Sequence, residues 1–180
     1  MSFAEAKEEF DRTIGNAIIS YRYFIRTLPP EGLFASGGSV TLNGKEFERY
    51  EQALAMFHEL GAVFFCRMEA SLEALINRLG IRGDLFLKKV EETGKFSAKD
   101  LEALRSAREL RNIFHHGAGD WTLLKNEPQL VRTSPQKEPV LYPDHIERFH
   151  FLFTAVGSVL CAAEQGVAPD GRSPTAPARR

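Results

Sequence analysis

The stretch "LAMFHELGAVFFCRMEASLEALINRLG", from Leu54 to Gly80, decides the fold class. Its apolar residues recur at spacings of three, four and seven, which is typical of one face of an α-helix. They are Leu54, Phe57, Gly61, Phe64, Phe65, Met68, Leu72, Leu75 and Leu79. We therefore expect a long helix over about residues 45–79 with this face buried. Gly80 suits its C-terminal cap, and Gly61 indicates a kink or a close contact between helices.

The same periodicity predicts helices on both sides of this stretch. Pro29 and Pro30 cannot continue the first of them. Ser97 and Asp100 have the spacing of a capping box, so they predict the start of a later helix. The predicted helices span residues 3–28, a short segment within 83–94, residues 98–116 and residues 144–165.

These elements predict an all-α fold, an antiparallel helical bundle of four to five helices. Residues 118–142 are rich in proline and carry alternating apolar residues, which predicts a long loop or small hairpin before the last helix. The hairpin would pair residues 121–125 with 129–133. We expect one helical domain over residues 1–166 and a disordered, Pro- and Arg-rich tail over 167–180.

Composition excludes several classes of protein. The net charge of -1 over 180 residues argues against broad non-specific nucleic-acid binding, although a local basic patch fits it. Cys66 and Cys161 lie in apolar surroundings and are expected to be buried free thiols. No CxxC pair indicates zinc, and we expect no metal and no cofactor. The acidic N-terminus and the lack of a long apolar run predict a cytoplasmic protein without membrane association.

The predicted helix 98–116 has two different halves. At about 100° per residue, its small and apolar residues gather on one side, and most of its cationic residues gather on the other. The apolar residues are Ala103, Ala107, Leu110 and Phe114; the polar half carries Arg105, Arg108, Asn112, His115 and His116, with Arg111 at its boundary. Arginine binds phosphate through two parallel hydrogen bonds, and histidine transfers protons near neutral pH. The alternative is a solvated face with salt bridges to Glu102 and Glu109.

The segment "RNIFHHG", Arg111–Gly117, resembles the R-x(4–6)-H signature of HEPN domains. Arg111 and His116 have the required spacing, and Asn112 matches the polar residue that often follows the family arginine. The motif covers six residues and lies late in a long helix, as it does in that family. The resemblance implies that Arg111, Asn112 and His116 are the catalytic residues.

The resemblance further implies a metal-independent endoribonuclease, a toxin or anti-phage effector that acts on RNA. Such enzymes work as homodimers in which two motifs meet at the subunit interface, and a nucleotidyltransferase-type antitoxin is an expected partner. The RNA 2′-hydroxyl would attack the phosphate while a histidine transfers a proton and an arginine stabilises the developing charge. The products would carry a 2′,3′-cyclic phosphate and a 5′-hydroxyl.

Helical geometry leaves the choice of histidine open. His115 shares the helical face of Arg111, whereas His116 lies about 140° away, near Asn112. Either the helix unwinds at Gly117, or Arg111 of one subunit serves His116 of the other.

Three residues are expected to support the site: His115, Arg108 and Glu69. Glu69 lies next to the buried stripe of the long helix, where its carboxylate would hold Arg111 or orient a histidine. The alternative is a solvent-facing Glu69 that pairs with Arg67 or with a neighbouring helix.

Two other functions remain open. One is a non-catalytic HEPN-like module that binds nucleotide or RNA through the same arginines. The other is a structural helical interaction protein. A monomer in which Arg111 is buried in an intramolecular salt bridge would favour the structural protein.

Overall fold

A computed structural model describes residues 2–34, 38–42, 44–83, 85–116, 132–133 and 139–164 of the chain. The α-helices of these residues are α1 (Phe3–Ile25), α2 (Tyr50–Arg78), α3 (Phe86–Glu92), α4 (Ala98–His116) and α6 (Pro143–Glu164). A short 3-10 turn, η1 (Glu31–Leu33), follows α1. The strands are β1 (Val40–Leu42), β2 (Lys45–Phe47), β3 (Arg132–Thr133) and β4 (Pro139–Val140). The predicted all-α fold class is confirmed.

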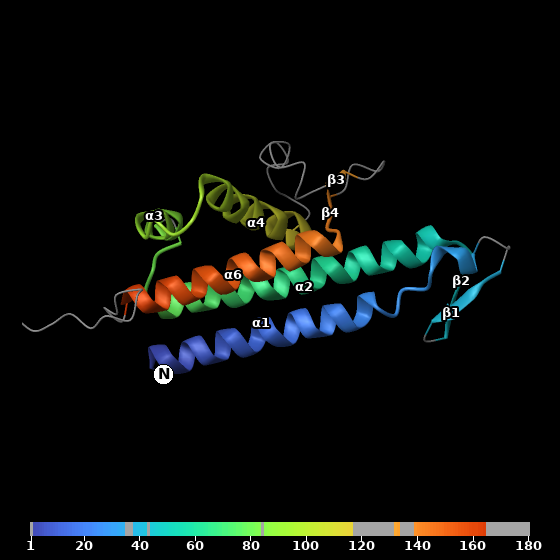
Figure 1. The fold of residues 1–180 in the computed structure, drawn as a ribbon, viewed down its shortest axis with the longest axis horizontal. Coiled ribbons are helices and arrows are strands. Elements are labelled where there is room, and N and C mark those ends of the chain that lie inside the picture. Colours follow the sequence, from blue (N-terminus) through green and yellow to red (C-terminus); the bar gives the residue numbers. More distant parts are fainter. Residues whose placement is uncertain are drawn as a thin grey trace, which may run out of the picture.

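Three long helices, α1, α2 and α6, lie side by side and form the body of the molecule (Figure 1). α1 runs opposite to α2 and α6, which share one direction. α3 and α4 cover one side of this body, and α4 runs opposite to α2. The predicted apolar face of α4 is buried at Ala103, Ala107 and Leu110, so this face fixes how α4 is seated on the bundle.

Aromatic rings fill the centre of the bundle. Phe65 of α2 is fully buried, and its ring centroid lies 4.9 Å from that of Phe149 and 6.1 Å from that of Phe153, both on α6. Its ring also meets Phe114 of α4 edge-on, with 6.2 Å between centroids. Phe65 of α2 thus contacts aromatic side chains of both α4 and α6.

The prediction for the start of α2 is wrong by five residues, because Lys45–Phe47 forms β2 instead of helix. β2 pairs antiparallel with β1, and Gly44 between them has a φ of 80°, which glycine adopts without strain. Phe47 is only 2% exposed. Its burial stabilises the extended segment, and the Asn-Gly pair at 43–44 is the signal that favours a hairpin here.

The prediction for the end of α2 is confirmed. Gly80 has a φ of 69°. Its N–H donates to the Asn77 carbonyl at 3.1 Å, and the Ile81 N–H donates to the Ile76 carbonyl at 3.1 Å. These two bonds form a Schellman motif, which satisfies carbonyls that the helix leaves unpaired.

α4 has the bounds that the sequence predicts. The Asp100 N–H donates to Ser97 Oγ at 3.2 Å, and the Ser97 N–H donates to Asp100 Oδ2 at 3.1 Å. This reciprocal pair is the expected capping box. α4 matters most here because it carries the candidate motif.

Other predictions have mixed outcomes. α1 ends at Ile25 rather than near residue 28. β3 lies within the predicted strand 129–133, but it pairs with β4, and the proposed partner 121–125 lies outside the described residues. The predicted tail 167–180 also lies outside them. Cys66 and Cys161 are buried free thiols, as expected.

α6 is the most apolar of the long helices. It is the one helix of the described residues that meets the length and composition of a membrane span. Nine of its residues are buried within the bundle, and the central helix of a bundle meets the same criterion. Gly157 allows the closest approach to α1, because a Cβ there would lie 2.3 Å from the Phe10 ring.

Candidate functional site

Arg111, the first residue of the motif, is bound by two carboxylates of α2. Its Nε lies 3.3 Å from Glu69 Oε2, and its Nη1 lies 2.9 Å from Glu73 Oε2. Glu69 and Glu73 are four residues apart, so they lie one above the other on the same helical face. The contact between Glu69 and Arg111 is therefore present. Glu73 was not among the predicted site residues, although its spacing from Glu69 could have indicated it.

The Glu69 carboxyl is the most buried member of this cluster. Its side chain is 12% exposed, and Oε2 has no hydrogen bond even though the Arg111 nitrogen is within ion-pair distance. Burial raises the pKa of Glu69 to about 7. The charge of Arg111 opposes this rise, that of Glu73 adds to it, and that of Arg108 opposes it. Glu69 thus exchanges a proton near neutral pH.

The raised pKa of Glu69 predicts how stability depends on pH. Between the ordinary pKa of 4.5 and about 7, the folded protein binds more protons at this site than the unfolded chain, so its stability falls as pH rises. We expect Glu69→Gln to remove this loss, on the order of 2 kcal/mol after allowance for partial solvent screening. Urea unfolding of both proteins at pH 4.5, 6 and 8 measures the difference. Parallel pH profiles for the two proteins would contradict the prediction.

The other arginines of α4 have different partners. Arg105 Nη1 lies 2.8 Å from Glu102 Oε2, the salt bridge that the solvated-face alternative expects. Arg108 is exposed, and its Nη1 donates to the Gly83 carbonyl at 3.3 Å, which is long for a hydrogen bond. Arg108 and Arg111 are both near enough to lower the pKa of Glu69. These two arginines therefore act together at the α2 carboxylates.

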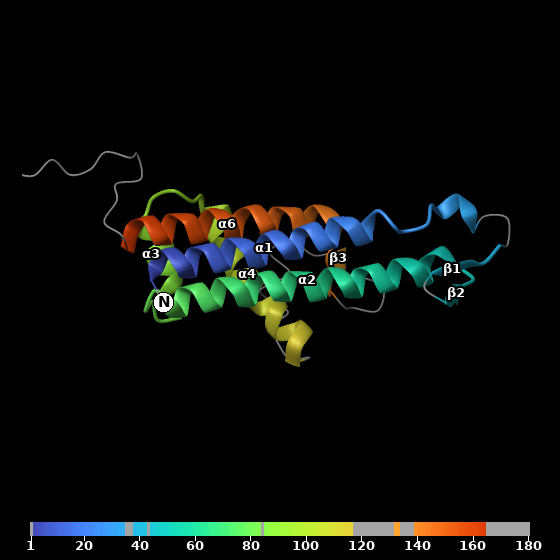
Figure 2. The same ribbon diagram turned by 90° about the horizontal axis from the view of Figure 1, so that it is seen from below.

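The end of α4 bears on the geometry of the two histidines. α4 stays helical through His116, so position 116 lies about 140° around the helix from Arg111. Asn112 is partly buried, and His115 has an exposed side chain. The His116 side chain and Gly117 lie outside the described residues. Seen from below, the last turns of α4 project past α2 and away from the three long helices (Figure 2).

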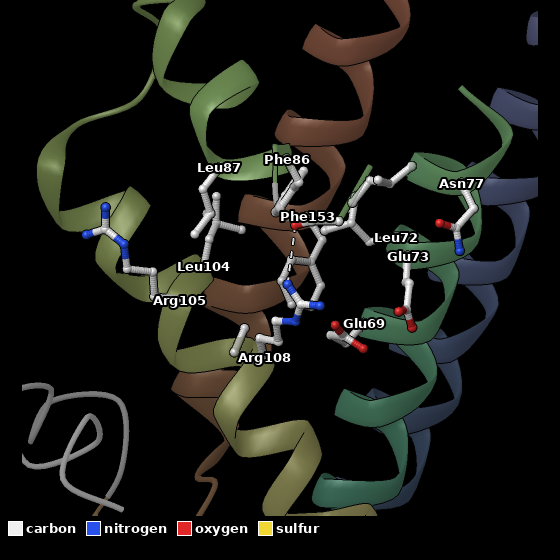
Figure 3. Close-up of a pocket in the computed structure, with 13 residues that line it drawn as sticks. Glu69, Leu72, Glu73, Asn77, Phe86, Leu87, Leu104, Arg105, Arg108 and Phe153 are labelled. Atoms are coloured by element: carbon white, nitrogen blue, oxygen red, sulfur yellow. Dashed lines mark hydrogen bonds between the residues drawn. The ribbon is translucent and has the colours of Figure 1, made fainter. Parts of the chain in front are cut away.

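A hollow opens next to the Arg111 cluster, among α2, α3, α4 and α6. It encloses about 590 Å³ of empty space, part of which is open to solvent. Its apolar floor includes Leu72, Ile76, Phe86, Leu87, Leu104 and Phe153. Glu69, Glu73 and Asn77 line it from α2, and Arg108 reaches into it from α4 (Figure 3). The hollow could not be predicted from the sequence, because residues from four separate helices line it.

Two of the remaining described histidines, His58 and His145, pack against Tyr142. The His58 ring meets that of Tyr142, with centroids 5.2 Å apart, and burial lowers its pKa. His145 is buried, and its Nδ1 accepts a hydrogen bond from the Tyr142 N–H at 3.1 Å. In the described part of the chain, no three His, Cys, Asp or Glu side chains come together as a metal-binding group.

Comparisons of the chain with protein-family models, with curated proteins and with solved structures found no match. The assignment of a function therefore depends on the motif and on the geometry around Arg111.

Proposed function

We propose that this protein is a metal-independent endoribonuclease of the HEPN type. Its active site would be composed of Arg111, Asn112 and His116, with His115, Arg108 and Glu69 in support. The observation that carries the proposal is the fixed position of Arg111. Two carboxylates hold its guanidinium, while 26% of its side chain stays exposed on the helix that bears the histidines. An arginine that is already held in place but remains accessible loses little side-chain conformational entropy when it binds a phosphate.

The two motifs would act together in a homodimer. On an ideal helix, position 116 lies about 140° around the axis from Arg111. The two side chains would therefore face the same phosphate only if the helix unwinds at Gly117 or if they belong to different subunits, and we favour different subunits. A two-fold axis near the end of α4 would bring Arg111 of one subunit to His116 of the other. Figure 2 shows that these turns project away from the three long helices.

The test is cleavage of mixed single-stranded RNA by the purified protein in excess EDTA. We expect cleavage to persist without divalent metal and to leave 2′,3′-cyclic phosphate and 5′-hydroxyl ends, because the 2′-hydroxyl is the nucleophile. An RNA with a 2′-O-methyl group at every position should resist cleavage. Cleavage of that RNA, or activity that EDTA abolishes, would contradict the mechanism.

A structural interaction protein is the second candidate, and one observation favours it. Arg111 forms an intramolecular salt bridge with Glu69 and Glu73, although its side chain is only partly buried. The structural protein also requires a monomeric state in solution. Sedimentation equilibrium decides this point: a monomer at micromolar concentration without RNA cleavage would favour the structural protein, and a dimer would favour the composite site.

Three expectations remain. A toxin or anti-phage role and a nucleotidyltransferase-type antitoxin as partner follow from the family resemblance, and a cytoplasmic location follows from the composition of the sequence. Co-expression with a candidate antitoxin that restores growth would test the first two.

A further inference from the structure

We propose that the hollow beside Arg111 is a binding site for a guanine base. The assignment of this base to an RNA substrate rests on the proposed function. The hollow itself consists of described residues only, and none of the residues that the motif makes catalytic lines it.

The lining of the hollow suits an aromatic ring. Concave sites with apolar walls and a few polar groups are typical of small-molecule binding. Here Phe86 and Phe153 contribute aromatic rings to the apolar wall. Bases taken out of a stack are commonly held against aromatic side chains and read at their edges.

The polar groups lie on two sides of this apolar floor and have opposite roles in hydrogen bonding. On the α2 side, the carboxylates of Glu69 and Glu73 accept hydrogen bonds, and the Asn77 amide lies one turn further on. On the α4 side, the Arg108 guanidinium only donates. Figure 3 shows Arg108 directed toward the carboxylates, whereas Arg105 points away from them.

Guanine is the base that matches this arrangement. Its Watson–Crick edge carries two adjacent donors, N1–H and the N2 amino group, which suit carboxylate acceptors. Its O6 and N7 are two adjacent acceptors, and an arginine bound to both is the commonest base-specific contact in protein–DNA complexes. Adenine, cytosine and uracil lack two adjacent donors on that edge.

The present partner of Arg108 can be exchanged at small cost. Its hydrogen bond to the Gly83 carbonyl is 3.3 Å long, and the acceptor is neutral. A base that offers two acceptors would replace one weak bond with two. The phosphate that follows such a base would lie toward Arg111, one turn along α4 from Arg108.

Binding of mononucleotides tests the site without any cleavage step. We expect guanosine 5′-monophosphate to bind in isothermal titration calorimetry at least about tenfold more tightly than the adenosine, cytidine and uridine analogues. Arg108→Ala and Glu69→Gln should each weaken binding about tenfold or more, because each removes one side of the match. Arg67→Ala is the matched control, since Arg67 is exposed on α2 and does not line the hollow. Equal affinity for all four nucleotides, or unchanged affinity in both variants, would overturn the proposal.

A second arm identifies the source of the base and separates this inference from the ribonuclease activity. Two DNA hexamers, one with a single guanine and one without, cannot be cleaved by 2′-hydroxyl attack. Tighter binding of the guanine hexamer than of the free nucleotide supports a nucleic-acid source, and the reverse supports a free nucleotide. If RNA is cleaved but guanine is not preferred, only the assignment of the hollow as a guanine-binding site is wrong. If guanine binds and RNA survives, only the ribonuclease proposal fails.

Discussion

Replacement of Arg111 by alanine is expected to reduce RNA cleavage at least about hundredfold. This is the usual loss when a group that stabilises transition-state charge is removed. Arg111→Lys should recover only part of the rate, because lysine cannot bind a phosphate through two parallel bonds. His116→Ala should lose about 10²- to 10⁴-fold as the acid or base is removed. Single-turnover rates on one RNA substrate measure these effects.

Stability must be measured beside the rate, because Arg111 also compensates the buried Glu69 charge. Arg111→Ala leaves that carboxylate without its nearest cation, so a fall in melting temperature is expected above pH 7, where Glu69 is ionised. Arg67→Ala again serves as the control, since it removes an exposed arginine of α2. If Arg111→Ala lowers stability but cuts RNA as well as wild type does, Arg111 has a structural role only.

Mixing of two inactive variants tests whether the site is shared between subunits. When Arg111→Ala and His116→Ala proteins form mixed dimers, one of the two Arg111–His116 pairs across the interface is intact. Recovery of a substantial part of the wild-type rate is therefore expected. If both residues acted within one subunit, every mixed dimer would stay inactive. The same experiment with His115→Ala in place of His116→Ala shows which histidine takes part.

The largest loss of stability is expected from Phe65→Ala. The Phe65 ring is fully buried and meets the rings of Phe114, Phe149 and Phe153, so its removal opens a cavity where three helices join. Truncation of a buried phenylalanine costs about 3–5 kcal/mol, a large share of the 5–15 kcal/mol of a typical domain. For a chain of this length, the melting temperature should fall by about 10 °C.

Phe151→Ala is the matched control for this prediction. Phe151 lies on α6 close to Phe149 and Phe153 in sequence, but it is 64% exposed. Its removal should change the free energy of unfolding by no more than about 0.5 kcal/mol. Similar losses for Phe65→Ala and Phe151→Ala in chemical unfolding would contradict the packing described for the core.

Local patterns in the sequence were sufficient for the helices. The period of the apolar residues defined α2 and α4, and local signals such as the Ser97–Asp100 pair and Gly80 located their ends. These features depend on residues at most a few positions apart, and one helix satisfies them by itself. The strand β2 was not predicted, because the burial of Phe47 outweighs the helical pattern around it.

The candidate site could be predicted only in part, because local patterns do not determine contacts between different helices. The sequence located Arg111, Asn112 and His116 on one helix, and it offered Glu69 as one partner for Arg111. It did not reveal Glu73 as the second partner, nor the hollow that Arg108 shares with α2, α3 and α6. Periodicity assigns a residue to a helical face, but the distance between faces of different helices depends on how the whole core packs. The sequence by itself therefore determined the helices and the motif, and only the tertiary structure decided which carboxylates hold its arginine.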